Sequence, residues 1–194
     1  MPTQLQLPLN EEQVRALQLN EQVELTGRIY TARDAVHKFL SEAEPKEIMQ
    51  APDLTNAVFY HCGPVIIKEQ GAWKVTAAGP TTSMREEPYM AGLIEKFALK
   101  AVIGKGGMGA ATAAACKRFG CVYLHAVGGA AQVLASTVKN IPSVHFLEEF
   151  GFPEALWCFE VEKFPAVVSM DAKGNSLHKQ VLQDSQQQKT ALCP

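Results

Sequence analysis

The 194-residue sequence lacks an excess of either charge. Its 18 lysines and arginines nearly balance its 20 aspartates and glutamates, for a formal net charge of −2. A nucleic-acid-binding domain normally carries a basic surface, so this balance argues against a nucleic-acid partner. A binding site for a small anion would therefore be built from a few placed cations rather than from a global field.

Long apolar runs are missing as well. No window approaches the ~18 uninterrupted apolar residues of a membrane-spanning helix, so no membrane association is expected. The first residues, MPTQLQLPLNEEQ, have no basic start followed by an apolar run, and no secretory signal is expected there. Both absences favour a cytoplasmic protein.

The cysteines are few, odd in number and irregularly spaced, which favours a reducing cytoplasm over a disulfide framework. They are Cys62, Cys116, Cys121, Cys158 and Cys193. The Cys116-x₄-Cys121 pair has no second pair to complete a ligand set, so the sequence predicts no metal site on this chain.

What is present is an ordinary globular composition, with 47% apolar and 20% charged residues. A chain of this length buries about two-thirds of its unfolded surface, enough for a core without metal or disulfide support. We find no internal repeat and no long linker. We therefore expect a single domain over residues 1–194, with a lead-in over 1–22 and a loose tail over 183–194.

The first half of the chain reads as antiparallel and hairpin-rich. Asn10 is a good N-cap for a short helix inside the lead-in. Hydrophobic alternation and turn residues predict the following elements: a strand at 23–30, a helix at 33–40, a strand at 57–60, and a hairpin of 65–68 with 73–77.

The second half reads as parallel and helix-crossed. Ser83 and Glu86 have the spacing of a capping box for a helix that runs to about residue 99. The further expected elements are a strand at 101–103, a helix at 110–119, a strand at 122–127, a helix at 130–139 and a strand at 144–147. This β-α-β-α-β order predicts a parallel sheet portion. Strands at 156–161 and 166–170 and a weak helix after Gly174 complete an α/β domain with a mixed sheet.

The segment from Gly104 to Gly109 matches G-x-G-x-x-G between a strand and a helix. The acidic residue that binds a ribose about 20 residues later is absent, which weakens a dinucleotide site. Lys105 precedes most of the glycines, so the segment is not a Walker A loop either. A glycine turn at a helix N-terminus still suits an anion. The plain alternative is a tight turn with a solvated lysine.

Three cations, Arg33, Arg85 and Lys105, each follow a predicted strand. Ligands of open α/β sheets gather at the carboxyl ends of strands, so converging ends would form a site for a small dianion such as a dicarboxylate. Arg85 lies in a first helical turn, where the dipole disfavours a cation unless an anion is near. Arg33 could instead pair with Asp34. His37 lies one turn beyond Arg33, where a histidine is more often structural.

Several linked motifs resemble one family, the β component of class I iron–sulfur fumarate hydratases and L-tartrate dehydratases. The resemblance covers roughly residues 20–177. The motifs are TARDAVH at 31–37, GPTTSMR at 79–85, IGKGGMG at 103–109, AVGGAA at 126–131, EALW at 154–157 and FPAVV at 164–168.

This resemblance implies a swivelling β/β/α domain and an α-subunit partner that carries a [4Fe–4S] cluster on its own cysteines. Some members fuse the two components. Because this sequence starts at Met1 and has no room for the α part, we expect a separate subunit in an αβ hetero-oligomer. The active site would lie between the components and would add or remove water across the double bond of a dicarboxylate. An iron of the cluster would act as a Lewis acid on the hydroxyl.

By the same resemblance, Arg33, Arg85 and Lys105 would bind substrate carboxylates. Thr81 would take part in proton transfer at carbon, together with an aspartate of the α subunit. His37, Gly104 and Gly106 are further candidates for the site.

The spelling of the motifs leaves the substrate open. Ser-Met-Arg at 83–85 is closer to tartrate dehydratases, whereas AVGGAA at 126–131 is closer to fumarases. We favour fumarate and malate, with L-tartrate as the alternative. A nicotinamide-dependent oxidoreductase and a non-catalytic scaffold are the remaining readings.

Overall fold

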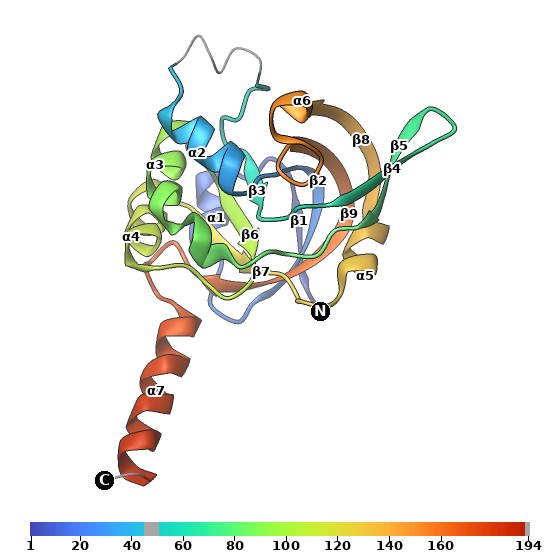
Figure 1. The fold of residues 1–194 in the computed structure, drawn as a ribbon. Helices are drawn as coiled ribbons and strands as arrows, with labels where there is room; N and C mark the ends of the chain where they lie inside the picture. The colour runs from blue at the N-terminus through green and yellow to red at the C-terminus, as the bar shows by residue number, and fades with distance from the viewer. Residues whose placement is uncertain (45–50, 193–194) are drawn as a thin grey trace.

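The computed structural model describes residues 1–44 and 51–192. Its centre is a seven-stranded sheet in the order β1-β2-β3-β6-β7-β9-β8 (Figure 1). The strands are β1 (Thr3–Gln6), β2 (Gln22–Thr31), β3 (Val58–Tyr60), β6 (Ala101–Gly104), β7 (Val122–His125), β8 (Val138–His145) and β9 (Leu156–Met170). The sheet is mixed, because β1, β2, β3, β6 and β7 run parallel and β9 runs antiparallel to its neighbours. The antiparallel arrangement expected for the first half is therefore wrong for β1, β2 and β3, which are connected through helices rather than tight turns.

The sheet closes on itself. Besides β7 and β8, strand β9 pairs with β2 along most of its length, from Gln22↔Val167 to Tyr30↔Cys158. The strands β2, β3, β6, β7 and β9 therefore form a closed ring. Alternate residues point to its two faces: Ile103 belongs to the core cluster inside the ring, and Val102 to the cluster beneath the helices. Burial on both faces explains why the short parallel strands are continuously apolar.

Helices cover the outer face of the parallel strands. In Figure 1 they gather on one side of the ring, where they supply Val36, Leu40, Met90 and Leu93 to the second core cluster. These helices are α2 (Asp34–Glu42), α3 (Glu87–Phe97) and α4 (Ala110–Phe119). A one-turn 3₁₀ helix, η2 (Ser83–Glu86), leads directly into α3. None of the helices in the described residues has the length and apolar character that crossing a bilayer requires.

Three short helices and a hairpin complete the fold. The helices are α1 (Glu11–Ala16), α5 (Ala131–Ser136) and α6 (Leu147–Phe150), and the hairpin pairs β4 (Val65–Glu69) with β5 (Ala72–Ala77). Two predicted helix ends are confirmed. Asn10 caps α1 in a capping box with Gln13, and α4 ends at Gly120, whose φ of 68° suits a glycine.

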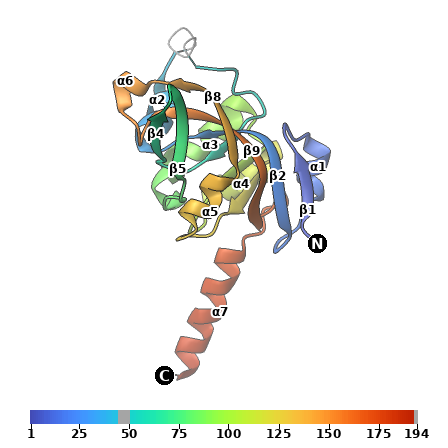
Figure 2. The same ribbon diagram turned by 90° about the vertical axis from the view of Figure 1, so that its right-hand side faces the viewer.

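The ends of the chain differ from the expectation. Residues 3–6, which we expected to lie in a lead-in, form a strand parallel to β2, and Leu5, Leu7 and Val14 are buried in the core. The tail that we expected to be loose from residue 183 is helical instead, because it belongs to α7 (Leu177–Leu192). This helix projects away from the ring in Figures 1 and 2, and its described residues from 179 onward are exposed.

The predicted β-α-β-α-β order is correct for β6-α4-β7 and wrong for its last strand. Strand β8 starts at Val138, within the predicted helix 130–139, and pairs antiparallel with β9 rather than parallel with β7. The cause is the length of β9, whose 15 residues include both segments predicted as separate strands. The four residues of β7 cover only its last part, and β8 pairs with the first.

Candidate active site

The carboxyl ends of the parallel strands lie at one edge of the ring. Arg33 follows β2, His61 follows β3 and Lys105 follows β6. The turn before η2 is laid across these ends by backbone hydrogen bonds: Thr81 N–H donates to the carbonyl of His61 (2.7 Å), and Lys105 N–H donates to the carbonyl of Thr81 (3.3 Å). Two of the four residues assigned from the resemblance, Thr81 and Lys105, are thereby brought together.

The two arginines meet at a shared carboxylate. Asp34 Oδ2 lies 2.5 Å from Arg85 Nη2 and 3.9 Å from Arg33 Nη2. Arg33 Nε also lies 3.3 Å from Glu154 Oε1. The Arg33 side chain is 22% exposed and that of Arg85 is 55% exposed, so both remain open to a ligand. The pairing of Arg33 with Asp34 that the sequence allowed is thus present, and Arg85 joins it.

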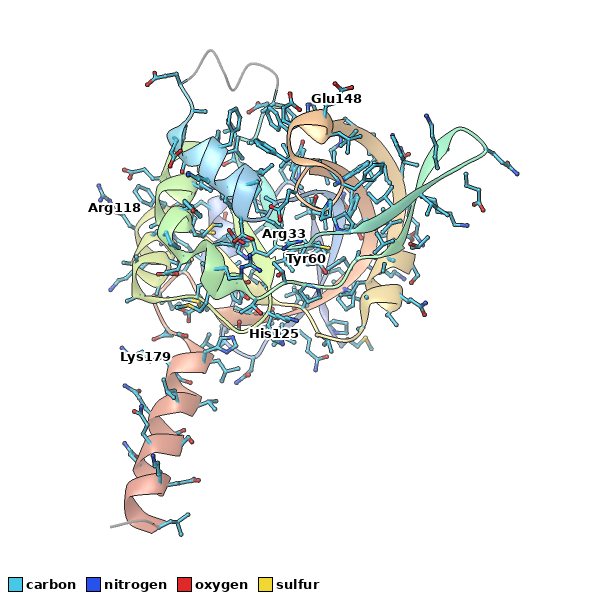
Figure 3. All side chains as sticks on the ribbon, in the orientation of Figure 1. Arg33, Tyr60, Arg118, His125, Glu148 and Lys179 are labelled. Atoms are coloured by element: carbon cyan, nitrogen blue, oxygen red, sulfur yellow. The ribbon has the colours of Figure 1, made fainter. Side chains whose placement is uncertain are left out.

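Figure 3 shows where this edge lies. Arg33 is at the middle of the view, whereas Arg118, Glu148 and Lys179 are at the periphery of the molecule. Lys105 is half-buried and lies against the turn that follows β7, where a Cβ placed on Gly128 would be 3.5 Å from its Cδ. The strand ends therefore bring Arg33 and Lys105 to the same edge, and η2 adds Arg85 through Asp34.

Thr81 is half-buried, and among the described residues its hydroxyl has no hydrogen-bond partner. The neighbouring Thr82 is exposed and makes no side-chain cap at the start of η2. The capping box predicted for Ser83 and Glu86 is wrong, because both side chains are fully buried and turned into the protein. Ser83 hydrogen-bonds to interior polar groups instead, whereas both carboxylate oxygens of Glu86 are buried without a hydrogen-bond partner among the described residues.

A network of buried polar groups lies beneath the turn. Ser83 Oγ is 2.8 Å from His61 Nδ1 and accepts a hydrogen bond from the Tyr123 hydroxyl at 2.8 Å. His37 Nδ1 lies 2.9 Å from the carbonyl of Arg33 and 3.3 Å from Glu86 Oε2. The rings of His37 and His61 meet edge to face, with centroids 4.9 Å apart.

Burial dominates the electrostatics of this network. It holds the pKa of His61 well below its usual value, and the adjacent His37 lowers that pKa further. Burial likewise raises the pKa of Tyr123. Both His61 and Tyr123 are therefore neutral near pH 7.

The two candidate glycines, Gly104 and Gly106, are explained by close contacts and by backbone conformation. A Cβ on Gly104 would lie 1.9 Å from Ser83 Oγ and 3.1 Å from the Tyr123 hydroxyl. Gly106 has a φ of +83°, a conformation that other residues rarely adopt. His37 touches the site through the Arg33 carbonyl, as described above.

The N-terminus of α4 is already occupied by a carboxylate. Glu87 accepts hydrogen bonds from the N–H groups of Gly109 (2.7 Å) and Ala111 (3.1 Å), and from the N–H and hydroxyl of Thr112 (3.2 and 2.7 Å). The anion that we expected at the glycine turn is therefore the carboxylate of Glu87, a residue of the chain itself. This also argues against a dinucleotide, whose pyrophosphate would need the same donors.

The cysteines do not provide a ligand set. Cys62, Cys116, Cys121 and Cys158 are buried free thiols, and Cys193 lies outside the described residues. Burial raises the pKa of Cys62 to about 12 and that of Cys121 well above its usual value. Across residues 1–44 and 51–192, no three histidine, cysteine or acidic side chains come together as metal ligands. The described residues do not fit an iron–sulfur cluster.

Three polar residues at this edge were missed from the sequence: His61, Glu87 and Tyr123. His61 carried a usable signal, since it directly follows a short apolar strand and precedes Cys62-Gly63-Pro64. Tyr123 and Glu87 carried none, because each acts on a segment more than 20 residues away in the chain.

The sequence matches known proteins over nearly its whole length. Residues 2–181 match the family described as Fumarase C-terminus. A protein named putative fumarate hydratase class I, from Geobacillus stearothermophilus, is 50% identical over 183 residues. That region is 93% of this chain but 34% of the Geobacillus protein, so this chain spans about a third of that relative.

Two relatives have lengths similar to this chain. A protein named putative L(+)-tartrate dehydratase subunit beta, from Methanocaldococcus jannaschii, is 38% identical over 89% of each chain. The L(+)-tartrate dehydratase subunit beta of Escherichia coli K12 is 36% identical over 89% of this chain and 85% of its own. From the extent of these matches and the order of the motifs at the strand edge, the chain belongs to the Fumarase C-terminus family.

Proposed function

We propose that this chain is the β component of a hydro-lyase that hydrates fumarate to malate reversibly. The observation that carries the proposal is one edge of the sheet. There Arg33 and Lys105 follow β2 and β6, on either side of β3, Thr81 is hydrogen-bonded across these strand ends, and Arg85 joins them through Asp34. A dicarboxylate needs cations at both of its ends, and this edge offers three. Dehydration of L-tartrate is the alternative, because the same edge suits both substrates and relatives carry both names.

The arginines bind substrate by exchanging one carboxylate for another. In the free chain, Asp34 sits between the guanidiniums of Arg33 and Arg85. A substrate carboxylate offers Arg85 a two-point contact, and planar guanidinium groups match carboxylates in this bidentate manner. Lys105, on the neighbouring strand end, holds the second carboxylate as a point charge. The same cations stabilise the negative charge that develops when the adjacent carbon loses its proton.

Thr81 is the group that handles this proton. Its hydroxyl is half-buried and unengaged by other described residues, so it is available to the substrate. A threonine is a weak base in water, and transfer through it requires a dry, cation-rich pocket and a second proton acceptor. We assign the second acceptor to an aspartate of the α subunit. The cations at the strand edge supply the positive field.

The reaction also needs a group that acts on the hydroxyl. We propose a [4Fe–4S] cluster carried by the α subunit, because the described residues of this chain do not fit one. Such a cluster supplies an iron that acts as a Lewis acid. This chain contributes substrate binding and proton transfer, and the complete site forms between the two components as a swivelling domain closes on its partner.

The proposal places the chain in an αβ hetero-oligomer in the cytoplasm, with a small dicarboxylate as substrate and with neither nucleic acid nor membrane as partner. To test it, the chain is co-expressed and purified anaerobically with an α component. The complex is assayed with fumarate, malate and both tartrates. Turnover of fumarate and malate by the complex, and by neither component alone, is expected. Turnover of one tartrate only would establish the alternative, and no turnover of any would overturn the proposal.

A further inference from the structure

The turn that carries Thr81 and Arg85 has little structure of its own. The 3₁₀ helix η2 has no side-chain cap at its start, and its N–H to carbonyl bond from Arg85 to Thr82 is long, at 3.4 Å. Thr82, Met84 and Arg85 are exposed on its outer side. Besides the Thr81 and Ser83 backbone bonds, the turn is held from beneath by the hydrogen bonds of the Ser83 side chain. The buried Glu86 carboxylate approaches His37 Nδ1 to 3.3 Å but makes no hydrogen bond with the described residues.

Two hydrogen bonds meet at Ser83. The Tyr123 hydroxyl donates to Ser83 Oγ at 2.8 Å. The Ser83 hydroxyl can then give its own proton to His61 Nδ1, which is also 2.8 Å away. A neutral imidazole accepts through one nitrogen and carries its proton on the other. In this arrangement His61 carries its proton on Nε2, a buried atom without a hydrogen-bond partner among the described residues.

His37 must have the opposite tautomer. Its Nδ1 lies 2.9 Å from the carbonyl oxygen of Arg33, which can only accept a hydrogen bond. The proton is therefore on Nδ1, and Glu86 Oε2 lies 3.3 Å from the same nitrogen. In this way His37 connects the backbone of Arg33 to the residue that follows Arg85.

We propose that His61 and Tyr123, acting through Ser83, and His37, acting through the Arg33 carbonyl and Glu86, are positioning residues for the hydro-lyase site. They fix the turn from three different elements, so that Thr81 and Arg85 face the same edge as Arg33 and Lys105. This inference rests on the proposed function. None of the three residues is assigned a contact with substrate.

The network contributes direction rather than stability. His37, His61, Ser83 and Tyr123 are all fully buried. Replacing hydrogen-bonded partners with apolar groups of the same shape is often nearly neutral for stability. A polar cluster also sets one orientation of its members, which an apolar cluster does not. Gly104 leaves the space in which Ser83 Oγ, Tyr123 and His61 meet.

The first test uses two replacements of His61 in the complex with the α component. His61→Asn keeps a polar group that can accept from Ser83 near the position of Nδ1, and His61→Leu removes it. Leucine suits a buried position better, so a purely structural role predicts the higher Tm and the higher kcat for His61→Leu. The positioning role predicts that the variant with the higher Tm has the lower kcat. His61→Leu has the higher Tm, but its kcat is about tenfold or more below that of His61→Asn, as displaced catalytic groups lose this much.

A matched pair of tyrosines tests the other arm. Tyr123→Phe removes only the hydroxyl that donates to Ser83. Tyr30→Phe removes a buried hydroxyl of the same core cluster whose neighbour is Cys158. We expect Tyr123→Phe to lower kcat about tenfold, with a KM change of less than about threefold, and Tyr30→Phe to leave both unchanged. Equal kinetics for the two variants would overturn the proposal.

A measurement on the full chain separates failure of this inference from failure of the proposed function. The ¹⁵N shifts of the histidine rings report which nitrogen carries the proton. We expect Nε2–H for His61 and Nδ1–H for His37 near pH 7.5, with the His61 Nδ1 shift moving in Tyr123→Phe. The same tautomer in both rings would overturn the network even in an active complex. Opposite tautomers in a complex that turns over no dicarboxylate would instead refute the proposed function, while the network itself would stand as described.

Discussion

Arg85 Nη2 and Asp34 Oδ2 lie 2.5 Å apart, although 51 residues separate them in the chain. Asp34 is the first residue of α2, and Arg85 belongs to η2. The contact joins two of the strand-end turns and places a carboxylate where we propose that a substrate carboxylate binds. This contact is our reference for the proposed binding of a substrate carboxylate by Arg85.

This contact predicts that Arg85→Lys loses activity although the charge is kept. A lysine cannot reproduce the two-point contact of a guanidinium with a carboxylate. The expected loss is about 1.5–3 kcal/mol of transition-state binding, roughly a 10- to 150-fold fall in kcat/KM. Steady-state kinetics of the complex with the α component measure it. Kinetics near those of the wild type would mean that Arg85 does not bind the substrate.

Thr81→Ala is expected to lower kcat far more than it raises KM, because a proton-transfer group acts in the transition state. The expected fall is roughly 10²–10⁴-fold, the usual contribution of such a group. Lys105→Ala should also raise KM, since it holds a carboxylate in the ground state. Steady-state kinetics of the complex with the α component measure kcat and KM for both variants.

Thr82→Ala is the control for this prediction. The hydroxyl of Thr82 is exposed and caps nothing, so its loss should change stability by less than about 0.5 kcal/mol and leave the rate unchanged. If Thr82→Ala abolishes turnover and Thr81→Ala leaves it unchanged, the proton-transfer residue is Thr82 rather than Thr81. If neither variant changes turnover, proton transfer belongs to the α subunit.

Gly104→Ala is expected to destabilise the fold, because the new methyl group would lie 1.9 Å from Ser83 Oγ. Overpacking of a buried site costs about 1–3 kcal/mol. Urea unfolding measures the change. Gly92→Ala is the matched control: its Cβ meets nothing within 4 Å, and it lies inside α3. There alanine should stabilise the protein by about 0.5–1 kcal/mol. A stable Gly104→Ala variant would contradict the crowding at the network.

Acid should destabilise the protein through His61. Burial lowers the pKa of His61 in the folded state below its unfolded value of about 6.5. Below that pH the unfolded chain binds the extra proton first, so the free energy of unfolding falls as the pH is lowered. His125 and His178, whose pKa values burial also lowers, act in the same direction. Urea unfolding between pH 7.5 and 5 should show the decline, with a smaller slope in His61→Asn. If the unfolding free energy of His61→Asn varied with pH as steeply as that of the wild type, His61 would not contribute to the decline.

The chain purified without its partner should be colourless and hold no stoichiometric iron, because its described thiols are buried and do not converge. Iron analysis after anaerobic reconstitution with iron and sulfide checks this. A brown chain with about four irons, the content of a [4Fe–4S] cluster, lost in Cys116→Ser or Cys121→Ser, would be the contrary result.

The sequence was most informative where structure is local. Gly120 ends α4, Asn10 starts α1, and the strand ends after β2 and β6 carry Arg33 and Lys105 as expected. Long-range competition limited the rest. Ser83 and Glu86 have capping spacing, but His61, Tyr123 and His37 from other elements engage them. Glu87 reaches the N-terminus of α4, and no local pattern shows that a helix end is already filled.

The pairing of β2 with β9 has a mechanical consequence. A sheet with two free edges can fan its strand ends apart, whereas a closed ring of strands cannot do so without breaking its ladders. The residues at the rim therefore keep their mutual spacing. On the proposed function, an α component would meet strand ends already at their final separation, and exposed side chains such as that of Arg85 would be the groups that adjust.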